Sequence, residues 1–461
     1  MAPGTSQVAA QLKEQLHHEH PDLILTTPED ERFDDARACF IVRSARPFAV
    51  ARPQTAQHVQ ALIKFCIDHD VDFCIRGGGH DCAGRTQVPG ALMIDMRGID
   101  YVRVDDSRAT ARIGGGVLLG DLTKALGEQG LVTPCGTIAT VGYTGWATLG
   151  GYGPFSSLYG MGVDQIVGAK LVNGTGTLVN ANDEILRGIR GGGGIFGAIV
   201  ELTIKVYPLQ KGQILFSLIV YESSDLEDTV LSYTQGYEQI KANAELPAAL
   251  SLQPMIVELP ELGKAFALLA VWGRDDHEEG RRWFDKIAGL SHCLMNSPEP
   301  ISLHKFVKNN EENLVTWLSY GRTYTTSVKR WTPQTAKVMA KYGKLIPGGG
   351  TAISVHTLRS PKPSKESVFG SRVDHLMVEI IAVSPDQMYE EKAAAWALAM
   401  QKELKETDPE NMLEGSYISL LSDEETDLRK VYGEYYDVLL GLKRKFDPQN
   451  VFKHTIPNLP V

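Results

Sequence analysis

The stretch CIRGGGHDCAGR, residues 74–85, combines three consecutive glycines with a histidine and an aspartate. A short predicted strand at 71–76 runs into three glycines, and the histidine His80 follows them directly. Glycine lets a main chain approach a ligand closely, and it lets backbone N–H groups converge on an anion. Two interpretations are open from this stretch alone. It is either a tight turn that carries a histidine, or a phosphate cradle with an imidazole beside it.

Further glycine-rich segments lie within the first 200 residues: ARIGGG at 111–116, GTIATVGYTGWATLGGYG at 136–153 and RGGGGIFGAIVEL from 190. The last contains a G-x-G-x-x-G pattern at Gly192, Gly194 and Gly197. That pattern precedes a predicted strand instead of linking a strand to a helix, which argues against a nicotinamide-binding turn. Tight turns would explain any one of these runs. Their number favours a cofactor that contains a pyrophosphate.

A length of 461 residues predicts two domains. Apolar spacing in the first part predicts a helix at 56–70, strands at 71–76, 91–100 and 109–116, a helix at 120–130, and a hairpin at 169–181. Asn173-Gly174 in that hairpin suits a type I′ turn.

Glycine becomes less frequent between residues 210 and 410, where predicted long apolar strands alternate with predicted amphipathic helices. This texture predicts an open, mostly antiparallel sheet backed by helices. The final stretch, 427–461, is predicted as a helix that ends at Asp447-Pro448, followed by an extended tail.

Charge and composition narrow the function classes. The net charge is −10 and no Lys/Arg cluster is visible, which disfavours a nucleic-acid partner. No signal peptide and no apolar run of about 20 residues is visible, so we expect a cytoplasmic protein without membrane contact. Cys66, Cys74 and Cys82 are evenly spaced, but no C-x-x-C pair occurs, and we expect no metal site.

Six segments occur in an order that is specific as a set: PFAVARPQTAQHVQALIKFC, RGGGHD, ARIGGGVLLGDL, YGMGVDQIVGAKLV, RGGGGIFGAIVELTIKVYPL and KFDPQNVF. Together they resemble the berberine bridge enzyme-like FAD-linked oxidases of the vanillyl-alcohol oxidase superfamily. The resemblance implies an α+β fold of two domains. An FAD-binding domain would span 1–208, an antiparallel-sheet substrate domain backed by helices 209–410, and 411–461 would return to the first domain.

The resemblance also implies how FAD is held. Arg76 to Asp81 match the pyrophosphate loop, His80 matches the histidine that the family joins to the flavin 8α-methyl group, and Cys135 matches a cysteine bonded to flavin C6. We therefore expect FAD linked covalently through both His80 and Cys135. The other residues that the resemblance places at the cofactor are Gly77, Gly78, Gly79, Gly136, Thr137, Gly142, Gly145, Gly150, Gly151, Gly153, Val200, Asn450 and Phe452.

The family's base is often a tyrosinate in a YxNY motif. The matching stretch here reads GSYISLLSDEE, in which Tyr417 matches the first tyrosine and Leu420 occupies the position of the second. Candidates for the base are Tyr417, Tyr143 and Tyr324. For each of them, packing with a satisfied hydroxyl group is the competing interpretation.

The function implied is an FAD-dependent oxidase of secondary metabolism. It would take a hydride from an alcohol or amine-bearing carbon of a medium-sized, possibly polycyclic metabolite, and pass the electrons to dioxygen to give H2O2. Its partners would be that small molecule and dioxygen, and the chain would act as a monomer or homodimer. Alternatives are an oligosaccharide oxidase, for which Trp146, Trp272 and Trp317 are available, and a flavin-dependent cyclase or non-oxidative flavoprotein.

Overall fold

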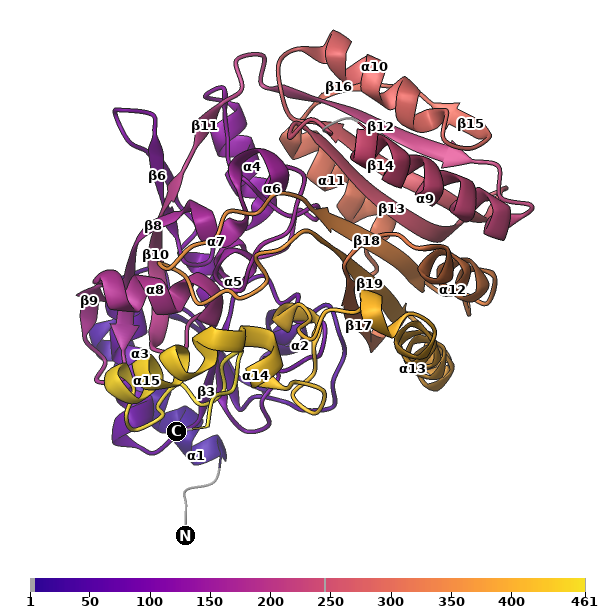
Figure 1. Cartoon of the computed structure of the whole chain (residues 1–461). Helices are drawn as coiled ribbons and strands as arrows, with labels where there is room; N and C mark the ends of the chain where they lie inside the picture. Colours follow the sequence, from indigo (N-terminus) through magenta and orange to yellow (C-terminus); the bar gives the residue numbers. More distant parts are fainter. Residues whose placement is uncertain (1–4, 244–245, 461) are drawn as a thin grey trace.

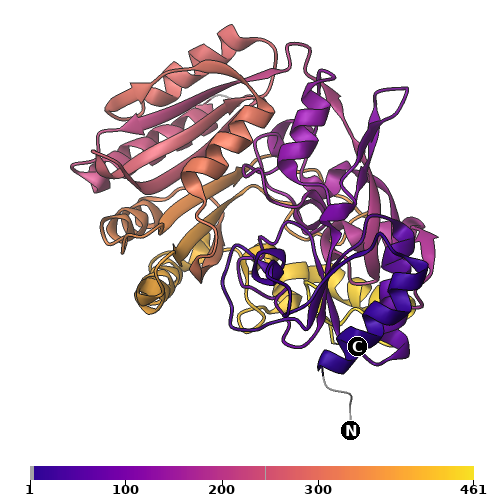
Figure 2. The same ribbon diagram turned by 180° about the vertical axis from the view of Figure 1, so that it is seen from behind.

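The computed structural model describes residues 5–243 and 246–460. Two bodies pack side by side (Figure 1). The first contains two sheets and also receives the C-terminal helices, and the second is one large sheet with helices over its outer face. Turning the molecule by 180° shows the same separation (Figure 2). The α+β architecture predicted from the sequence is confirmed.

The sheet that carries the first glycine loop has the order β1-β2-β4-β3. Its strands are β1 (Ile24–Thr26), β2 (Ala49–Arg52), β4 (Leu92–Asp95) and β3 (Phe73–Arg76). β3 and β2 both run parallel to β4, and α3 (Ala56–Asp68) crosses between β2 and β3. Thr55 caps α3, which buries the apolar face that its spacing predicts. The crossover delivers the chain to the glycines that follow Arg76.

The second sheet of the first body is antiparallel, with the order β5-β6-β10-β8-β9. Its strands are β5 (Val102–Val104), β6 (Thr110–Gly114), β10 (Gly197–Lys205), β8 (Ile166–Asn173) and β9 (Leu178–Asn180). The two-residue turn predicted at Asn173-Gly174 is wrong. The positive φ falls at Gly176, and the Asn173 side chain accepts hydrogen bonds from the N–H groups of Thr175 and Thr177, which makes a longer loop.

Short elements connect these sheets. The helices of the first body are α1 (Thr5–Glu19), α2 (Phe33–Arg37), α4 (Leu119–Gly127), α5 (Tyr143–Thr148), α6 (Ser156–Tyr159), α7 (Gly162–Gln165) and α8 (Asp183–Gly192). A two-stranded pair joins β7 (Leu131–Val132) to β11 (Tyr207–Pro208). The glycines at 191–194 form the end of α8 and its link to β10, so they precede a strand as predicted.

The second body is an eight-stranded antiparallel sheet. Its strands are β12 (Gln213–Tyr221), β13 (Leu250–Leu259), β14 (Gly263–Trp272), β15 (Cys293–Asn296), β16 (Glu299–Ser302), β17 (Tyr320–Val328), β18 (Ala352–Leu358) and β19 (His375–Ser384). Its outer face is covered by α9 (Leu226–Asn243), α10 (His277–Ala288), α12 (Pro333–Lys344) and α13 (Glu390–Thr407). α11 (Leu303–Leu314) lies on the other side, against α4.

Successive side chains along each strand of the large sheet point alternately to the helix-covered core and to the opposite, open face. In β19, Val378 and Ile380 belong to the core beneath the helices, whereas Glu379 and Ile381 point to the opposite, open face. The same period of two holds in β18, where Ile353 is in that core. One face of the sheet is therefore a conventional hydrophobic core, and the other face is available for a site.

The C-terminal segment returns to the first body through α14 (Leu428–Tyr432) and α15 (Tyr436–Phe446). α15 ends at Phe446 with Asp447 as its C-cap, where the Asp447-Pro448 pair predicts the end of the helix. Lys443 and Asp447 are each 1% exposed and form an ion pair of 2.6 Å. Lys443 also donates to the Ile195 carbonyl at 2.9 Å, and Asp447 accepts from the Phe452 N–H at 3.0 Å. This pair fixes the C-terminal helix against the glycine run that precedes β10.

We expect Lys443→Met to lower the free energy of unfolding by about 3–5 kcal/mol, because it leaves the Asp447 carboxylate buried without its counter-charge. The matched control is Lys445→Met on the same helix, whose partner Glu184 is 52% exposed and whose own side chain is 55% exposed. Loss of that exposed pair should cost about 1 kcal/mol at most. Chemical denaturation followed by circular dichroism measures both, and equal losses would contradict this account.

Candidate active site

A cavity of about 900 Å³ is lined by both bodies. The first body contributes the loop after β3, part of the 136–153 segment and the loop before β10. The second body contributes the open face of the large sheet and one side of α11. The predicted cofactor residues that line the cavity are Gly77, Gly78, Gly79, His80, Asp81, Gly136, Thr137, Gly142 and Gly145.

The glycines of the first loop allow two backbones to touch. A Cβ on Gly78 would lie 2.3 Å from the Thr140 carbonyl oxygen, and one on Gly142 would lie 2.6 Å from the Gly78 nitrogen. Gly79 has φ +76°, a conformation that favours glycine. Among the described residues, the backbone N–H groups of Gly78, Gly79 and His80 donate to no protein acceptor. Free N–H groups at the rim of a cavity fit a pyrophosphate.

Arg76 supports this loop from beneath instead of lining the cavity. It is 1% exposed, its Nη1 lies 3.3 Å from Asp95 Oδ2, and it donates to the carbonyls of Ala36 and Ala38. Arg76 is therefore not part of the cavity lining, and its contact with the cofactor stays a prediction. Its side chain leaves β3 on the side away from the cavity, where it ties the loop to the 36–38 segment.

His80 lies at the start of a hydrogen-bonded chain that crosses between the two bodies. Its Nε2 is 2.7 Å from Thr140 Oγ1, and Thr140 Oγ1 is 2.6 Å from Glu311 Oε2 on α11. The imidazole stacks on Phe40 at 5.5 Å and meets the edge of Trp317 at 4.9 Å. Burial lowers the pKa of His80 to about 4, although Glu311 acts in the opposite direction. The ring is therefore neutral at pH 7, which is the nucleophilic form.

Cys135 is placed differently from the expectation. It is fully buried in the apolar core of the first body, and the cavity wall beside it is made by Gly136, Thr137 and Ile138. Burial raises the pKa of its thiol to about 12, so the nucleophilic thiolate is disfavoured. The structure does not bring Cys135 to the cavity with His80.

The three candidate tyrosines lie in different places relative to the cavity. Tyr417 lines the cavity, where burial raises the pKa of its hydroxyl to about 12. Tyr143 is fully buried in the same core as Cys135. Tyr324 points from β17 into the core beneath the helices and stacks under Arg322. Tyr143 and Tyr324 therefore pack in cores and do not line the cavity, because strand parity and helix facing turn them away from it.

The remaining predicted cofactor residues also have packing roles. A Cβ on Gly153 would lie 1.8 Å from the Cys135 carbonyl oxygen, and one on Gly150 would meet Tyr417 at 3.0 Å. Gly151 packs against Gly162 in the same way. None of the predicted residues in the following group lines the cavity: Gly150, Gly151, Gly153, Val200, Asn450 and Phe452. They shape the first body behind the wall, as Phe452 does by meeting the edge of Phe73.

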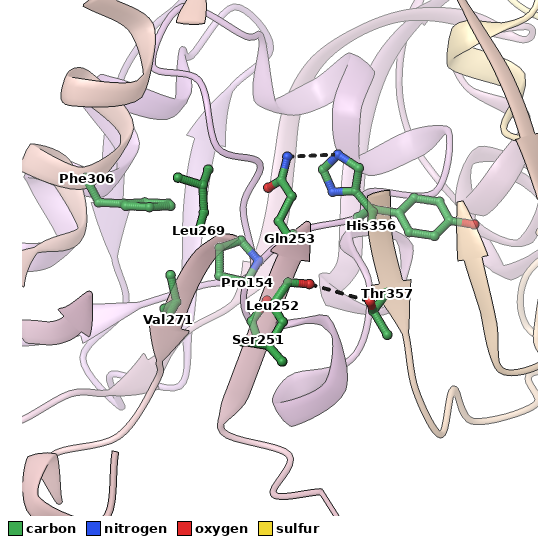
Figure 3. Close-up of a pocket in the computed structure, with 11 residues that line it drawn as sticks. Pro154, Ser251, Leu252, Gln253, Leu269, Val271, Phe306, His356 and Thr357 are labelled. Carbon is green, nitrogen blue, oxygen red and sulfur yellow. Dashed lines mark hydrogen bonds between the residues drawn. The ribbon is translucent and has the colours of Figure 1, made fainter. Parts of the chain in front are cut away.

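A polar cluster on the open face of the sheet escaped sequence reasoning. Nε2 of His356 lies 3.2 Å from Oε2 of Glu379, and the Gln253 amide lies 3.4 Å from the same imidazole nitrogen and 2.9 Å from Ser354 Oγ. Figure 3 shows Gln253 and His356 facing each other from neighbouring strands. The sequence did contain an indication of this cluster, because Glu379 is the one carboxylate in the mostly apolar strand HLMVEIIAVS.

Comparison with known proteins agrees with this geometry. Residues 47–182 match the FAD-binding domain family. The chain is 29% identical over 448 residues to FAD-linked oxidoreductase aurO of Gibberella zeae, covering 95% of this chain and 86% of that protein. The chain is an FAD-dependent oxidoreductase.

Solved structures show that this oxidoreductase shares its fold with known oxidases. Superposition on 6-hydroxy-D-nicotine oxidase from Arthrobacter nicotinovorans gives a TM-score of 0.82 at 21% identity, over 95% of this chain and 98% of that one. Superposition on BBE-like 1 of Physcomitrella patens also gives 0.82, at 19% identity and over 100% of both chains. The family resemblance drawn from the glycine motifs is confirmed.

Two further properties concern the described part of the oxidoreductase. Within residues 5–243 and 246–460, no helix is long and apolar enough to cross a membrane. Over the same residues, no three His, Cys, Asp or Glu side chains form a group that could hold a metal ion.

We expect Gly78→Ala to reduce FAD content and to destabilise the protein by about 1–3 kcal/mol, because its Cβ would overlap backbone that cannot give way. The control is Gly127→Ala at the end of α4, where a Cβ meets nothing within 4 Å. Alanine there should be neutral or stabilising by up to about 1 kcal/mol. Flavin absorbance per protein and the thermal midpoint measure both variants. Normal flavin content in Gly78→Ala would refute the close-approach role.

Proposed function

We propose that this protein is an FAD-dependent oxidase that takes a hydride from an alcohol or amine-bearing carbon of a medium-sized, largely apolar molecule. Dioxygen would then accept the electrons and give H2O2. The proposal is carried by one observation: a single cavity joins the glycine loops and His80 on one wall to the His356–Glu379 pair on the other. When bound, FAD supplies the hydride acceptor.

The residues present fit the cofactor at two points. The free N–H groups of Gly78, Gly79 and His80 would hold the pyrophosphate. The neutral imidazole of His80 would form one covalent bond to the flavin. We propose this single bond in place of the two expected from the sequence, because Cys135 is buried in the core of the first body and does not line the cavity.

The substrate wall is largely apolar. The side chains that the open sheet face presents to the cavity include Phe216, Leu218, Met255, Val257, Leu269 and Ile381. Such a wall favours an apolar or aromatic molecule over an oligosaccharide, whose many hydroxyl groups would be left without partners. Trp272 lies in the helix-backed core and Trp317 is not among the residues that line the cavity, so Trp146 alone of the three candidate tryptophans faces it.

The proton that leaves with the hydride needs an acceptor, and Glu379 is our candidate. Its carboxylate faces the cavity, where the His356 N–H at 3.2 Å holds it in place. Tyr417 lines the same cavity with a hydroxyl pKa of about 12, so it stays protonated at neutral pH and would donate a hydrogen bond to the substrate. The roles are thus divided between a carboxylate base and a phenol donor.

The attachment is tested by acid precipitation. We expect Cys135→Ala to keep its flavin in the precipitate as the parent protein does, whereas His80→Ala should release all of it into the supernatant. The thiol takes part in no bond to the flavin in our proposal, and the imidazole forms the sole one. Absorbance of pellet and supernatant measures both. Flavin that stays with the His80→Ala pellet would show that a second link exists.

The chemistry is tested on a panel of aryl alcohols and cyclic amines. We expect at least one to consume dioxygen with one H2O2 formed per O2, and Glu379→Gln to slow flavin reduction by that substrate about 10²-fold, the usual scale for a positioned base. Glu403→Gln on α13 is the control, since its carboxylate pairs with Lys341 on the far side of the sheet. A Glu379→Gln rate within threefold of the parent would remove this residue from the mechanism. No H2O2 from any panel member would contradict the oxidase proposal.

A further inference from the structure

We infer that Glu311, acting through Thr140, sets the tautomer of His80 and receives its proton while FAD becomes covalently attached. The inference rests on the proposed attachment at His80. Glu311 belongs to α11 of the second body, whereas His80 and Thr140 belong to the first. The three side chains form one continuous chain of 2.7 Å and 2.6 Å contacts.

The direction of each hydrogen bond follows from the carboxylate. An ionised carboxylate can only accept, so the Thr140 hydroxyl donates its proton to Glu311 Oε2. The threonine oxygen is then left to accept, and the donor is the Nε2–H of His80. With its proton on Nε2, the neutral imidazole carries its lone pair on Nδ1. The chain therefore selects one of the two ring nitrogens as the nucleophile.

The surroundings keep Glu311 ionised. Besides the Thr140 hydroxyl, Oε2 accepts the Thr140 backbone N–H at 3.1 Å, and Oε1 accepts the indole N–H of Trp317 at 2.9 Å. Burial raises the pKa of this carboxyl, but these hydrogen bonds outweigh burial and the net direction is downward. Trp317 also meets the edge of the His80 ring, so the same indole serves the base and the nucleophile.

A bond forms between His80 Nδ1 and the flavin 8α-carbon, and the proton that the methyl group gives up ends on the ring system once that is reduced. The electron pair of that C–H bond remains in the ring system, which is left reduced by two electrons. The Nε2 proton passes to Thr140, whose own hydroxyl proton passes to Glu311. Dioxygen, the acceptor of the proposed oxidase, then removes the electron pair and gives H2O2, which restores the oxidised flavin.

The experiment measures the covalent attachment of FAD to the protein and not catalytic turnover. Protein produced under riboflavin starvation is mixed with FAD in air, and the flavin retained after acid precipitation is measured against time. We expect Glu311→Gln to slow attachment by about 10²-fold or more, the scale of a positioned proton acceptor. Binding of FAD before attachment, measured by ultrafiltration, should be unchanged. The control is Glu312→Gln, the exposed neighbour on the same helix, which should attach FAD at the parent rate.

A threonine pair keeps the test decisive if Glu311→Gln folds poorly. Thr140→Val removes the hydroxyl and should slow attachment as Glu311→Gln does, whereas Thr140→Ser keeps it and should restore the parent rate. Attachment in Glu311→Gln and Thr140→Val within twofold of the parent would overturn the inference. If the parent itself retains no flavin in acid, or if His80→Ala retains it, the proposed attachment fails instead, so the two failures are distinguishable.

Discussion

The close approach of two backbones at Gly78 and Gly142 is the constraint on which the site depends. A Cβ at either position would come within 2.6 Å of the other segment, so the contact exists because both residues lack one. This contact puts Thr140 beside His80, and the N–H groups of Gly78, Gly79 and His80 have no acceptor among the described residues. The cofactor wall is therefore built by backbone packing, and the side chains that could react are positioned by it.

The opposite wall follows from a different rule, the period of two in a β-strand. The large sheet uses one set of alternate residues for a helix-covered core and the other set for the cavity. Stability and chemistry are thus assigned to opposite faces of the same strands. A polar residue such as Glu379 can stand on the open face without disturbing the core, because its neighbours Val378 and Ile380 point the other way.

These two rules explain which parts of the candidate site could be predicted from the sequence and which could not. Glycine runs and the strand–glycine–histidine order are local features, so the first wall and His80 were predictable from the motif. Which way a side chain faces depends on the register between distant segments. That is why Cys135, Tyr143 and Tyr324 were expected at the site and are found in cores. Gln253, His356 and Glu379 meet from three strands, and Gln253 precedes His356 by 103 residues, so no local motif predicts their meeting.

The placement of Glu311 links the two walls. His80 and Thr140 are fixed by the glycine contact in the first body, but the carboxylate that orients them lies on α11 of the second. The relay is complete only when the bodies are packed together, since neither contains all three groups. Covalent attachment through this relay would therefore follow assembly of the whole cavity. A flavin bound to the first body alone would meet an imidazole with no fixed tautomer and no proton acceptor, and so would remain unattached until the substrate wall is in place.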